Sequence, residues 1–135
     1  MAQTHLFRVI LPARDIEEAV RFYSTVLESE GERVSPNRHY FPCGATILAL
    51  VQPMGAEGAF RHANPDHVYL AVADLEAALE RCRAAGASRF DVPDQEPGIA
   101  LRPWGERSFY VHDPSGNPLC FVEAGSEFTG GAFVR

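Results

Sequence analysis

Histidines, cysteines and carboxylates are residues of this chain that could bind a metal ion or take part in catalysis. The three cysteines, Cys43, Cys82 and Cys120, are widely spaced, so they form neither a disulfide framework nor a C-x-x-C metal or redox motif. We expect three reduced, mostly buried thiols. No G-x-S-x-G motif predicts a nucleophilic serine, and no G-x-x-x-x-G-K or G-x-G-x-x-G motif predicts a nucleotide site. The candidate chemistry therefore depends on histidines, carboxylates and the strands that carry them.

Two stretches of the chain repeat one pattern, in which an alternating run ends in aspartate and a helical pattern follows. Residues 7–15 and residues 66–74 both have this form. Asp15 and Asp74 stand where an N-cap accepts the free N–H groups of a first helical turn. Gly86 follows the second helical run and is placed as its C-cap glycine. The sequence therefore predicts two similar strand–helix units.

Strand patterns follow each helical run and complete the two halves. We expect strands at 38–41 and 46–51 in the first half, and at 108–112 and 119–123 in the second. Residues 91–107 contain three prolines and predict a long loop or a splayed hairpin. The end of the chain either frays or forms an arm on a partner subunit, and we favour fraying. We expect one domain over residues 1–135, divided into unit one (5–52), a linker (53–65), unit two (66–124) and a tail (125–135).

Composition argues against several classes of partner. The 135 residues carry a formal charge of −6 with no block of like charges, whereas binding of nucleic acid needs a basic face. This charge suits a soluble protein, or one with a cationic ligand. No apolar run approaches the roughly 20 residues of a membrane span, and the first residues lack the pattern of a secretory leader. We therefore expect a cytoplasmic protein without nucleic-acid or membrane partners.

Two segments carry a resemblance to a known superfamily. Residues 103–117, P-W-G-E-R-S-F-Y-V-H-D-P-S-G-N, resemble a W-G-x-R-x-F-Y-x-x-D-P-x-G-N segment of the glyoxalase / bleomycin-resistance / extradiol-dioxygenase (vicinal-oxygen-chelate) superfamily. Residues 15–23, D-I-E-E-A-V-R-F-Y, are similar to its helix opening D-x-x-x-A-x-x-F-Y. The resemblance covers about residues 5 to 124. It implies an α+β fold of two tandem βαβββ units, with curled half-barrel sheets and the helices on the convex side.

The resemblance also implies positions for metal ligands on the concave face. They lie seven residues before each capping aspartate and on the last strand of each unit, and His67 and Glu123 match them in unit two. In unit one the same positions are Arg8 and Val51, and neither side chain offers a lone pair to a metal. His5 is a possible third ligand, but its odd offset from Arg8 predicts that it points to the other face. Two of the four implied ligand positions are therefore matched.

A second interpretation needs no metal. Arg8 would then replace the charge of the metal and lie close to Glu123, because a buried carboxylate needs a cationic partner. His67 would then be a hydrogen-bonded cavity histidine instead of a metal ligand. We favour a protein without a cofactor, and a divalent metal (Zn, Fe, Mn or Ni) is the alternative.

Alternation along the strands predicts a mostly apolar pocket, which suits a small organic ligand. Its aromatic side chains would either stack on the ligand or pack as ordinary core. Trp104 is expected over the mouth of the pocket, and the facing of Tyr110 and His112 is left open. The residues predicted to face the ligand are Arg8, Ile10, Ile47, Ala49, Tyr69, Leu119, Phe121 and Trp104.

These patterns support two hypotheses about function. The first is a small-molecule-binding protein with an incomplete metal site, like the antibiotic-binding members of the superfamily, and with a homodimer as its assembly. The alternative is a metal-dependent lyase or dioxygenase of the glyoxalase-like class that uses His67 and Glu123, with Glu123 as ligand or catalytic base. Whether the chain is an enzyme is left open by the sequence.

Overall fold

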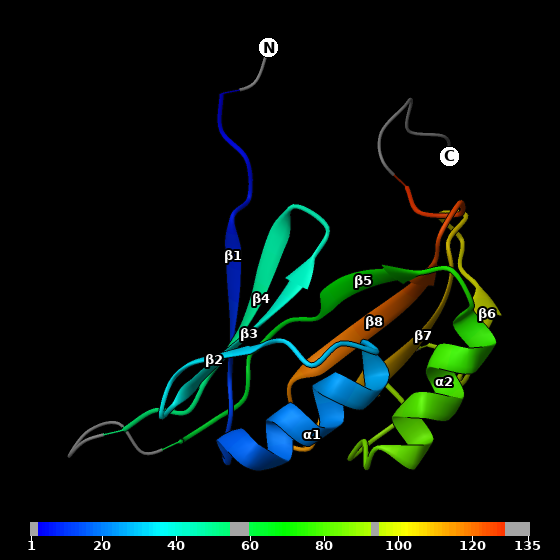
Figure 1. Cartoon of the computed structure of the whole chain (residues 1–135). Helices are drawn as coiled ribbons and strands as arrows, with labels where there is room; N and C mark the ends of the chain where they lie inside the picture. Colours follow the sequence, from blue (N-terminus) through cyan, green and yellow to red (C-terminus); the bar gives the residue numbers. More distant parts are fainter. Residues whose placement is uncertain (1–2, 55–59, 93–94, 129–135) are drawn as a thin grey trace.

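The computed structural model describes residues 3–54, 60–92 and 95–128 and contains two units of the same element order (Figure 1). Parts of the predicted linker (55–59), of the predicted loop (93–94) and of the predicted tail (129–135) lie outside these residues. Unit one consists of β1 (Arg8–Pro12), α1 (Ile16–Val26), β2 (Glu32–Ser35), β3 (Arg38–Cys43) and β4 (Thr46–Val51). Unit two consists of β5 (Val68–Val72), α2 (Leu75–Ala84), β6 (Ala100–Leu101), β7 (Arg107–His112) and β8 (Pro118–Glu123).

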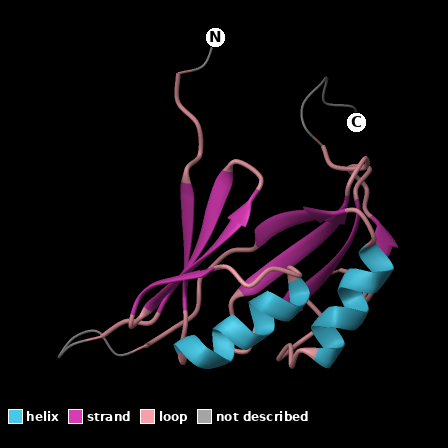
Figure 2. Ribbon diagram, in the orientation of Figure 1, coloured by secondary structure: helices cyan, strands magenta, loops and turns pink. Residues whose placement is uncertain are grey.

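Each unit forms one four-stranded sheet, and the two sheets have equivalent strand orders. These orders are β1-β4-β3-β2 and β5-β8-β7-β6. The pairs β1–β4 and β5–β8 are parallel, and the remaining pairs are antiparallel. The predicted α+β class and the tandem βαβββ arrangement are therefore confirmed, although neither sheet closes into a barrel. Figure 2 shows the two helices side by side, with the sheets on one side of them.

The predicted N-caps start both helices. The carboxylate of Asp15 accepts hydrogen bonds from the backbone N–H groups of Glu17 and Glu18, at 2.9 and 3.0 Å. Asp74 accepts one from the N–H of Ala77 at 3.0 Å. These bonds satisfy donors that the first turn of a helix leaves without an intrahelical partner. The two aspartates thus fix where each helix leaves its first strand.

The two helices end differently. Gly86 follows the C-cap of α2 with a φ of +89°, as predicted, because glycine adopts this conformation without a Cβ clash. After α1 the left-handed residue is Glu28, with a φ of +52°. Gly31 comes three residues later with a φ of +60°, and a Cβ placed on it would lie 2.6 Å from the carbonyl oxygen of Tyr40. Gly31 therefore allows the chain to pass close to β3.

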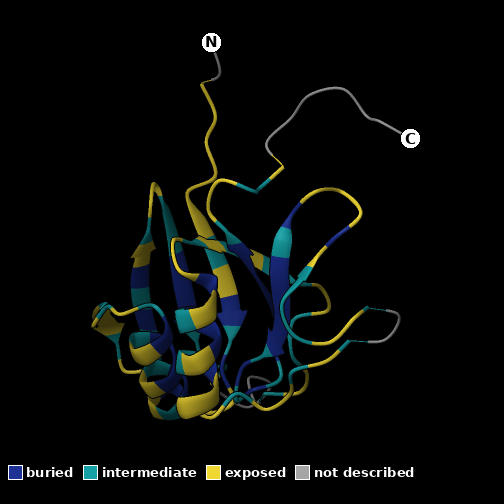
Figure 3. Ribbon diagram, turned by 90° about the vertical axis from the view of Figure 1, so that its right-hand side faces the viewer, coloured by how far each residue is buried: buried dark blue, intermediate teal, exposed yellow. Residues whose placement is uncertain are grey.

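One apolar core extends through both units. It contains the inner faces of both helices and the sheet residues that face them, while the outer helix faces are exposed (Figure 3). Phe109 and Phe121 stack within this core, with ring centroids 5.2 Å apart. The three cysteines are free thiols, and Cys82 and Cys120 are buried. Neither helix within the described ranges is long and apolar enough to cross a bilayer.

A buried turn in unit two connects the units by hydrogen bonds. The carboxylate of Asp113 accepts bonds from the Tyr23 hydroxyl at 2.7 Å, from the backbone N–H groups of Ser115 and Asn117, and from the Asn117 side chain. The Asn117 amide also donates to the carbonyl of Pro12 at 2.7 Å. Tyr23 and Pro12 belong to unit one, so this turn joins the two halves.

Candidate functional site

The strand register shows which residues of the second sheet share a face. Tyr69 on β5 is paired with Cys120 on β8, and Cys120 is paired with Tyr110 on β7. Directly paired residues point the same way and successive residues alternate, so these three side chains share the face away from the helices. Phe109 and Phe121 point to the opposite face, into the core. The helix-free face of the second sheet is therefore the available surface.

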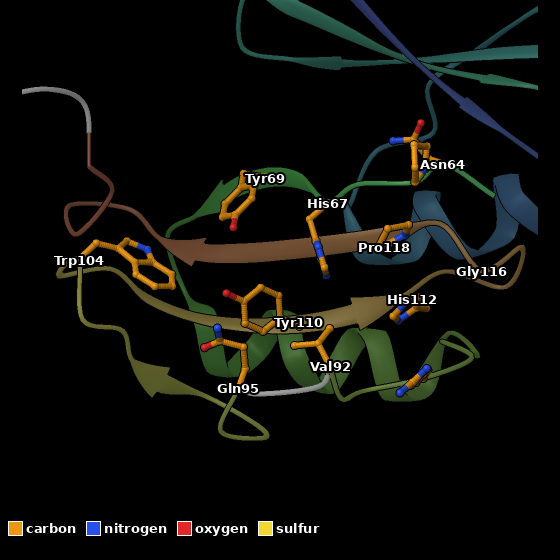
Figure 4. A pocket seen from close by; sticks show the side chains of 12 residues that line it. Asn64, His67, Tyr69, Val92, Gln95, Trp104, Tyr110, His112, Gly116 and Pro118 are labelled. Carbon is orange, nitrogen blue, oxygen red and sulfur yellow. The ribbon is translucent and has the colours of Figure 1, made fainter.

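A pocket of about 520 Å³ lies on this face (Figure 4). Two tyrosines, two histidines and a tryptophan form much of its wall. Figure 4 shows Trp104 at one end and His112 at the other, with Tyr69, His67 and Tyr110 between them. The lining residues include His67, Tyr69, Arg89, Trp104, Tyr110 and His112.

The two histidines have ring nitrogens without hydrogen-bond partners. His67 packs edge-on against the ring of Tyr110 with centroids 5.0 Å apart, and its ring lies 6.3 Å from that of His112. His67 Nε2 and His112 Nδ1 are both buried, and no described residue bonds either atom. Burial also lowers the pKa of both imidazoles, so both are neutral at pH 7. Each neutral ring offers one N–H donor and one acceptor.

The tyrosines of the pocket are also neutral. Burial raises the pKa of Tyr69 to about 12, and it also raises the pKa of Tyr110. Tyr110 lies against Arg102, whose guanidinium carbon is 4.8 Å from the centre of the tyrosine ring. Arg102 itself is buried and donates to the Ser108 side chain and to backbone carbonyls. The floor of the pocket is therefore a fixed aromatic ring supported by a buried cation.

The indole of Trp104 is held at its end of the pocket by a carboxylate. Trp104 Nε1 donates to Glu106 Oε1 at 2.8 Å. The second oxygen of Glu106 accepts from the backbone N–H of Phe128, also at 2.8 Å. Trp104, predicted over the pocket mouth, does line the pocket, and Glu106 and Phe128 set its orientation.

Glu123 does not face this pocket. The register places it opposite Val72, on the face that the helices cover, three residues beyond Cys120. Its carboxylate pairs with Arg107 at 2.5 Å, and Arg107 also pairs with Glu76 on α2 at 2.6 Å. The prediction that Glu123 lies on the concave face beside His67 is therefore wrong, because an odd offset along a strand reverses the side chain.

The predicted proximity of Arg8 and Glu123 is also wrong within the chain. Glu123 has Arg107 as its cationic partner. Arg8 is exposed on the first sheet, where its guanidinium carbon lies 4.9 Å from the ring centres of both Phe7 and Tyr40. Cation–π contact with these rings takes the place of the predicted ion pair.

The other residues predicted to line the pocket have different positions in the two units. In unit one, Ile10 and Ala49 are direct partners in the register and share the helix-free face with Arg8 and Ile47. Ile10 is half exposed there, whereas Ala49 is fully buried. In unit two, Leu119 and Phe121 lie in the core, so the prediction that they face the pocket is wrong.

The residues present do not fit the divalent metal that the resemblance implies. His67 and Glu123 point to opposite faces of the second sheet. Cys120 shares the face of His67, but burial raises the pKa of its thiol to about 11, which disfavours the thiolate that a metal requires. Within the described residues, no three His, Cys, Asp or Glu side chains gather as a metal site. The site instead offers neutral donors and acceptors together with the guanidinium of Arg89.

Sequence reasoning left three important residues unassigned. Tyr110 and His112 alternate with Phe109 and Val111, and this alternation is a signal that could have placed them opposite the core. Arg89 had no such signal, because it lies outside a regular strand and reaches the pocket through an isolated bridge to His112.

Comparison with known proteins agrees with this architecture. The family model described as a glyoxalase-like domain matches residues 8–122. No curated protein matches the chain. Among solved structures, a glyoxalase / bleomycin resistance protein / dioxygenase from Nocardioides is 23% identical, with a TM-score of 0.65 and coverage of 97% of this chain and 92% of that one.

Two further structures are similar over almost their whole length. A glyoxalase-related enzyme from Fulvimarina pelagi is 19% identical, with a TM-score of 0.73 and coverage of 95% and 99% of the two chains. The oxidase ChaP-H2 is 22% identical, with a TM-score of 0.71 and coverage of 96% and 100%. At these identities the likeness shows the fold.

Proposed function

Since the chain belongs to the glyoxalase-like domain family, we propose that it binds a small organic molecule with an aromatic part in the pocket around His67. In this proposal the binding needs no metal. The ligand would lie along the helix-free face of the second sheet, between Trp104 at one end and His112 at the other.

The observation that carries the proposal is the pair of buried imidazole nitrogens without partners, His67 Nε2 and His112 Nδ1. A buried polar atom that makes no hydrogen bond costs about 1–3 kcal/mol, so folded proteins normally satisfy such atoms. A ligand with oxygen or nitrogen atoms at this place would satisfy both. Both histidines line a pocket that is large enough for such a molecule.

The walls of the pocket favour an aromatic ligand. Tyr69, Tyr110 and Trp104 offer ring faces and edges, and aromatic pairs contribute about 0.5–1.5 kcal/mol beyond the burial of area. Trp104 is oriented by Glu106, and Tyr110 is supported by Arg102, so both rings have defined positions before a ligand binds. A site that is ordered in advance loses less entropy on binding.

The alternative of a metal-dependent lyase or dioxygenase is less well supported. It requires His67 and Glu123 on one metal ion, and these side chains lie on opposite faces of the sheet. Moving Glu123 to the pocket would also break its ion pair with Arg107. We therefore assign no catalytic or metal-binding role to Glu123 in the proposal.

We also propose a homodimer. The first sheet presents its helix-free face to solvent, and Ile10 on the edge strand β1 is half exposed there. A symmetric pair of chains is the commonest way to cover such a self-complementary surface.

The test uses the fact that Trp104 is the single tryptophan of the chain. Its indole N–H gives one signal in a two-dimensional NMR spectrum of ¹⁵N-labelled protein. We expect naphthalene-2-carboxamide, a neutral aromatic probe, to shift this signal in a saturable manner. His67→Leu removes a hydrogen-bonding partner and should weaken the affinity about ten-fold.

The matched control is His62→Leu. His62 is an exposed histidine between the units and does not line this pocket. This variant should bind the probe like the wild type. An indole signal that stays unchanged at millimolar probe would contradict the proposal, as would equal weakening by the two histidine substitutions.

A further inference from the structure

The described residues that line the pocket include a positively charged side chain and no negatively charged one. Among the described residues that line it, Arg89 carries the one full charge, and none is an aspartate or glutamate. The other polar contributions come from neutral groups, including the amides of Asn64 and Gln95, two phenols and two imidazoles. A cationic ligand would find no carboxylate in this lining, whereas an anionic ligand would find a guanidinium and several N–H and O–H donors.

Arg89 lies at the histidine end of the pocket. The backbone N–H of His112 donates to the carbonyl of Arg89 at 2.8 Å, in an isolated bridge that ties the two residues together. The side chain of Arg89 donates through Nε to Asp91 at 2.8 Å, and both side chains of this pair are more than half exposed. Solvent screens such an exposed pair, so Asp91 neutralises Arg89 only in part.

The guanidinium of Arg89 also has unused donors. Of its five N–H groups, the contacts with described residues use the one on Nε. The terminal nitrogens are those that form paired bonds with a carboxylate or another oxyanion. A positive group with free donors therefore lies at the same end of the pocket as His112.

At the tryptophan end of the pocket, the nearby charged group is a carboxylate. The carboxylate of Glu106 lies there, and Trp104 and Phe128 hold it by two hydrogen bonds. Arg102 lies behind Tyr110, on the floor of the pocket, with its guanidinium carbon 4.8 Å from the centre of the ring. The two ends of the pocket therefore differ, because Arg89 lies at the histidine end and the Glu106 carboxylate holds the tryptophan end.

The net charge of the chain, taken alone, would suggest a cationic ligand. The chain carries −6, which favours a cationic ligand at long range. Charges more than about 8 Å apart are largely screened at physiological salt, so the groups inside the pocket decide what binds there. From these groups we infer that the ligand is an aromatic oxyanion, a carboxylate or a phenolate, with its charged oxygen at Arg89 and His112 and its ring toward Trp104. This inference rests on the proposed function, because it assigns a ligand class to the same pocket.

The experiment compares three probes of one shape and different charge. These are naphthalene-2-carboxylate, naphthalene-2-carboxamide and naphthalen-2-ylmethylammonium, each titrated at pH 7.5 and monitored through the Trp104 indole signal and by calorimetry. We expect the carboxylate to bind about ten-fold more tightly than the amide, and the ammonium probe to bind most weakly. The preference for the carboxylate should decrease as salt is added.

Two substitutions at the histidine end should act in opposite directions. Arg89→Gln removes the charge and should abolish the preference for the carboxylate, because the carboxylate affinity should fall more than the amide affinity. Asp91→Asn removes the competing carboxylate from Arg89 and should strengthen binding of the carboxylate probe. Opposite effects would distinguish a role in recognition from a role in structure, since a purely structural salt bridge would be lost in both variants.

Arg83→Gln is the matched control. Arg83 is an exposed arginine on α2 that pairs with Glu80, so its loss changes the net charge equally without touching the pocket. Equal affinities for the three probes would overturn the inference and leave the pocket proposal standing, and so would tightest binding of the ammonium probe. Failure of all three probes to bind would overturn both. An effect of Arg83→Gln as large as that of Arg89→Gln would also overturn the inference.

Discussion

At the scale of single residues, the carboxylate of Asp113 gives a test of the hydrogen bonds that join the two units. Its carboxylate is almost fully buried and accepts four hydrogen bonds, one of them from the Tyr23 hydroxyl on α1. Tyr23→Phe keeps the ring in the core but removes one donor from a buried charge. We expect a loss of about 1–3 kcal/mol in the free energy of unfolding, measured by urea denaturation.

Tyr40→Phe is the comparison for this prediction. The Tyr40 hydroxyl accepts a 3.2 Å bond from Arg38 at a half-buried position, so its removal should cost less than about 1 kcal/mol. Equal losses in the two variants would mean that the bond to Asp113 contributes no more than an ordinary surface contact.

The facing of single residues was the least predictable property of the site. Counting along one strand placed Tyr69 on the same face as His67, and the structure has both side chains in one pocket. Counting failed for Phe121 and Glu123, because their facing depends on the register of β8 against β5, about 50 residues earlier in the chain. A shift of one residue in that register reverses every side chain, and nothing within the strand itself fixes it.

At the scale of elements, Gly31 gives a test of how closely the chain packs against β3. Gly31 and Gly44 have almost the same φ, +60° and +61°, so alanine should suffer similar backbone strain at both, about 1–2 kcal/mol. At Gly31 the new Cβ would also meet the backbone oxygen of Tyr40 at 2.6 Å, whereas at Gly44 it would meet nothing within 4 Å. We expect Gly31→Ala to cost about 1–3 kcal/mol more than Gly44→Ala.

Thermal unfolding of the two variants, followed by circular dichroism, measures this difference. The pair separates steric contact from conformational strain because the strain is common to both. If Gly44→Ala destabilised the protein as much as Gly31→Ala, the close approach to β3 would not be the reason for glycine at position 31.

Most elements were predictable from local pattern, and the exceptions have physical causes. Both helices begin directly after their predicted N-cap residues, and the strands β3, β4, β7 and β8 lie within two residues of their predicted bounds. The strand β6 was expected only as part of a loop or splayed hairpin, because its two residues are too few to alternate and prolines surround them. Such a short strand forms only because it pairs with β7, and this contact cannot be read from the local sequence.

At the scale of the whole molecule, the open face of the first sheet predicts the state of assembly. We expect sedimentation at micromolar concentration to give a mass twice that of the 14.8-kDa chain. Ile10→Glu places a charge at a half-exposed position on that face and should shift the equilibrium toward the monomer. A wild-type chain that sediments as a stable monomer would contradict the homodimer.

The position of β8 has a consequence for how the protein is made. β8 is the last strand in the sequence, yet it is an inner strand of its sheet and pairs with both β5 and β7. A ribosome releases the chain from its N-terminus onward, so β5 emerges long before its neighbour exists. Until residues 118–123 are synthesised, the nascent second half keeps an unpaired strand edge and an uncovered α2, both of which invite aggregation. A chain that terminates just before β8 should therefore misfold and be bound by chaperones or degraded by proteases. This should happen although nearly nine-tenths of the chain would already be present.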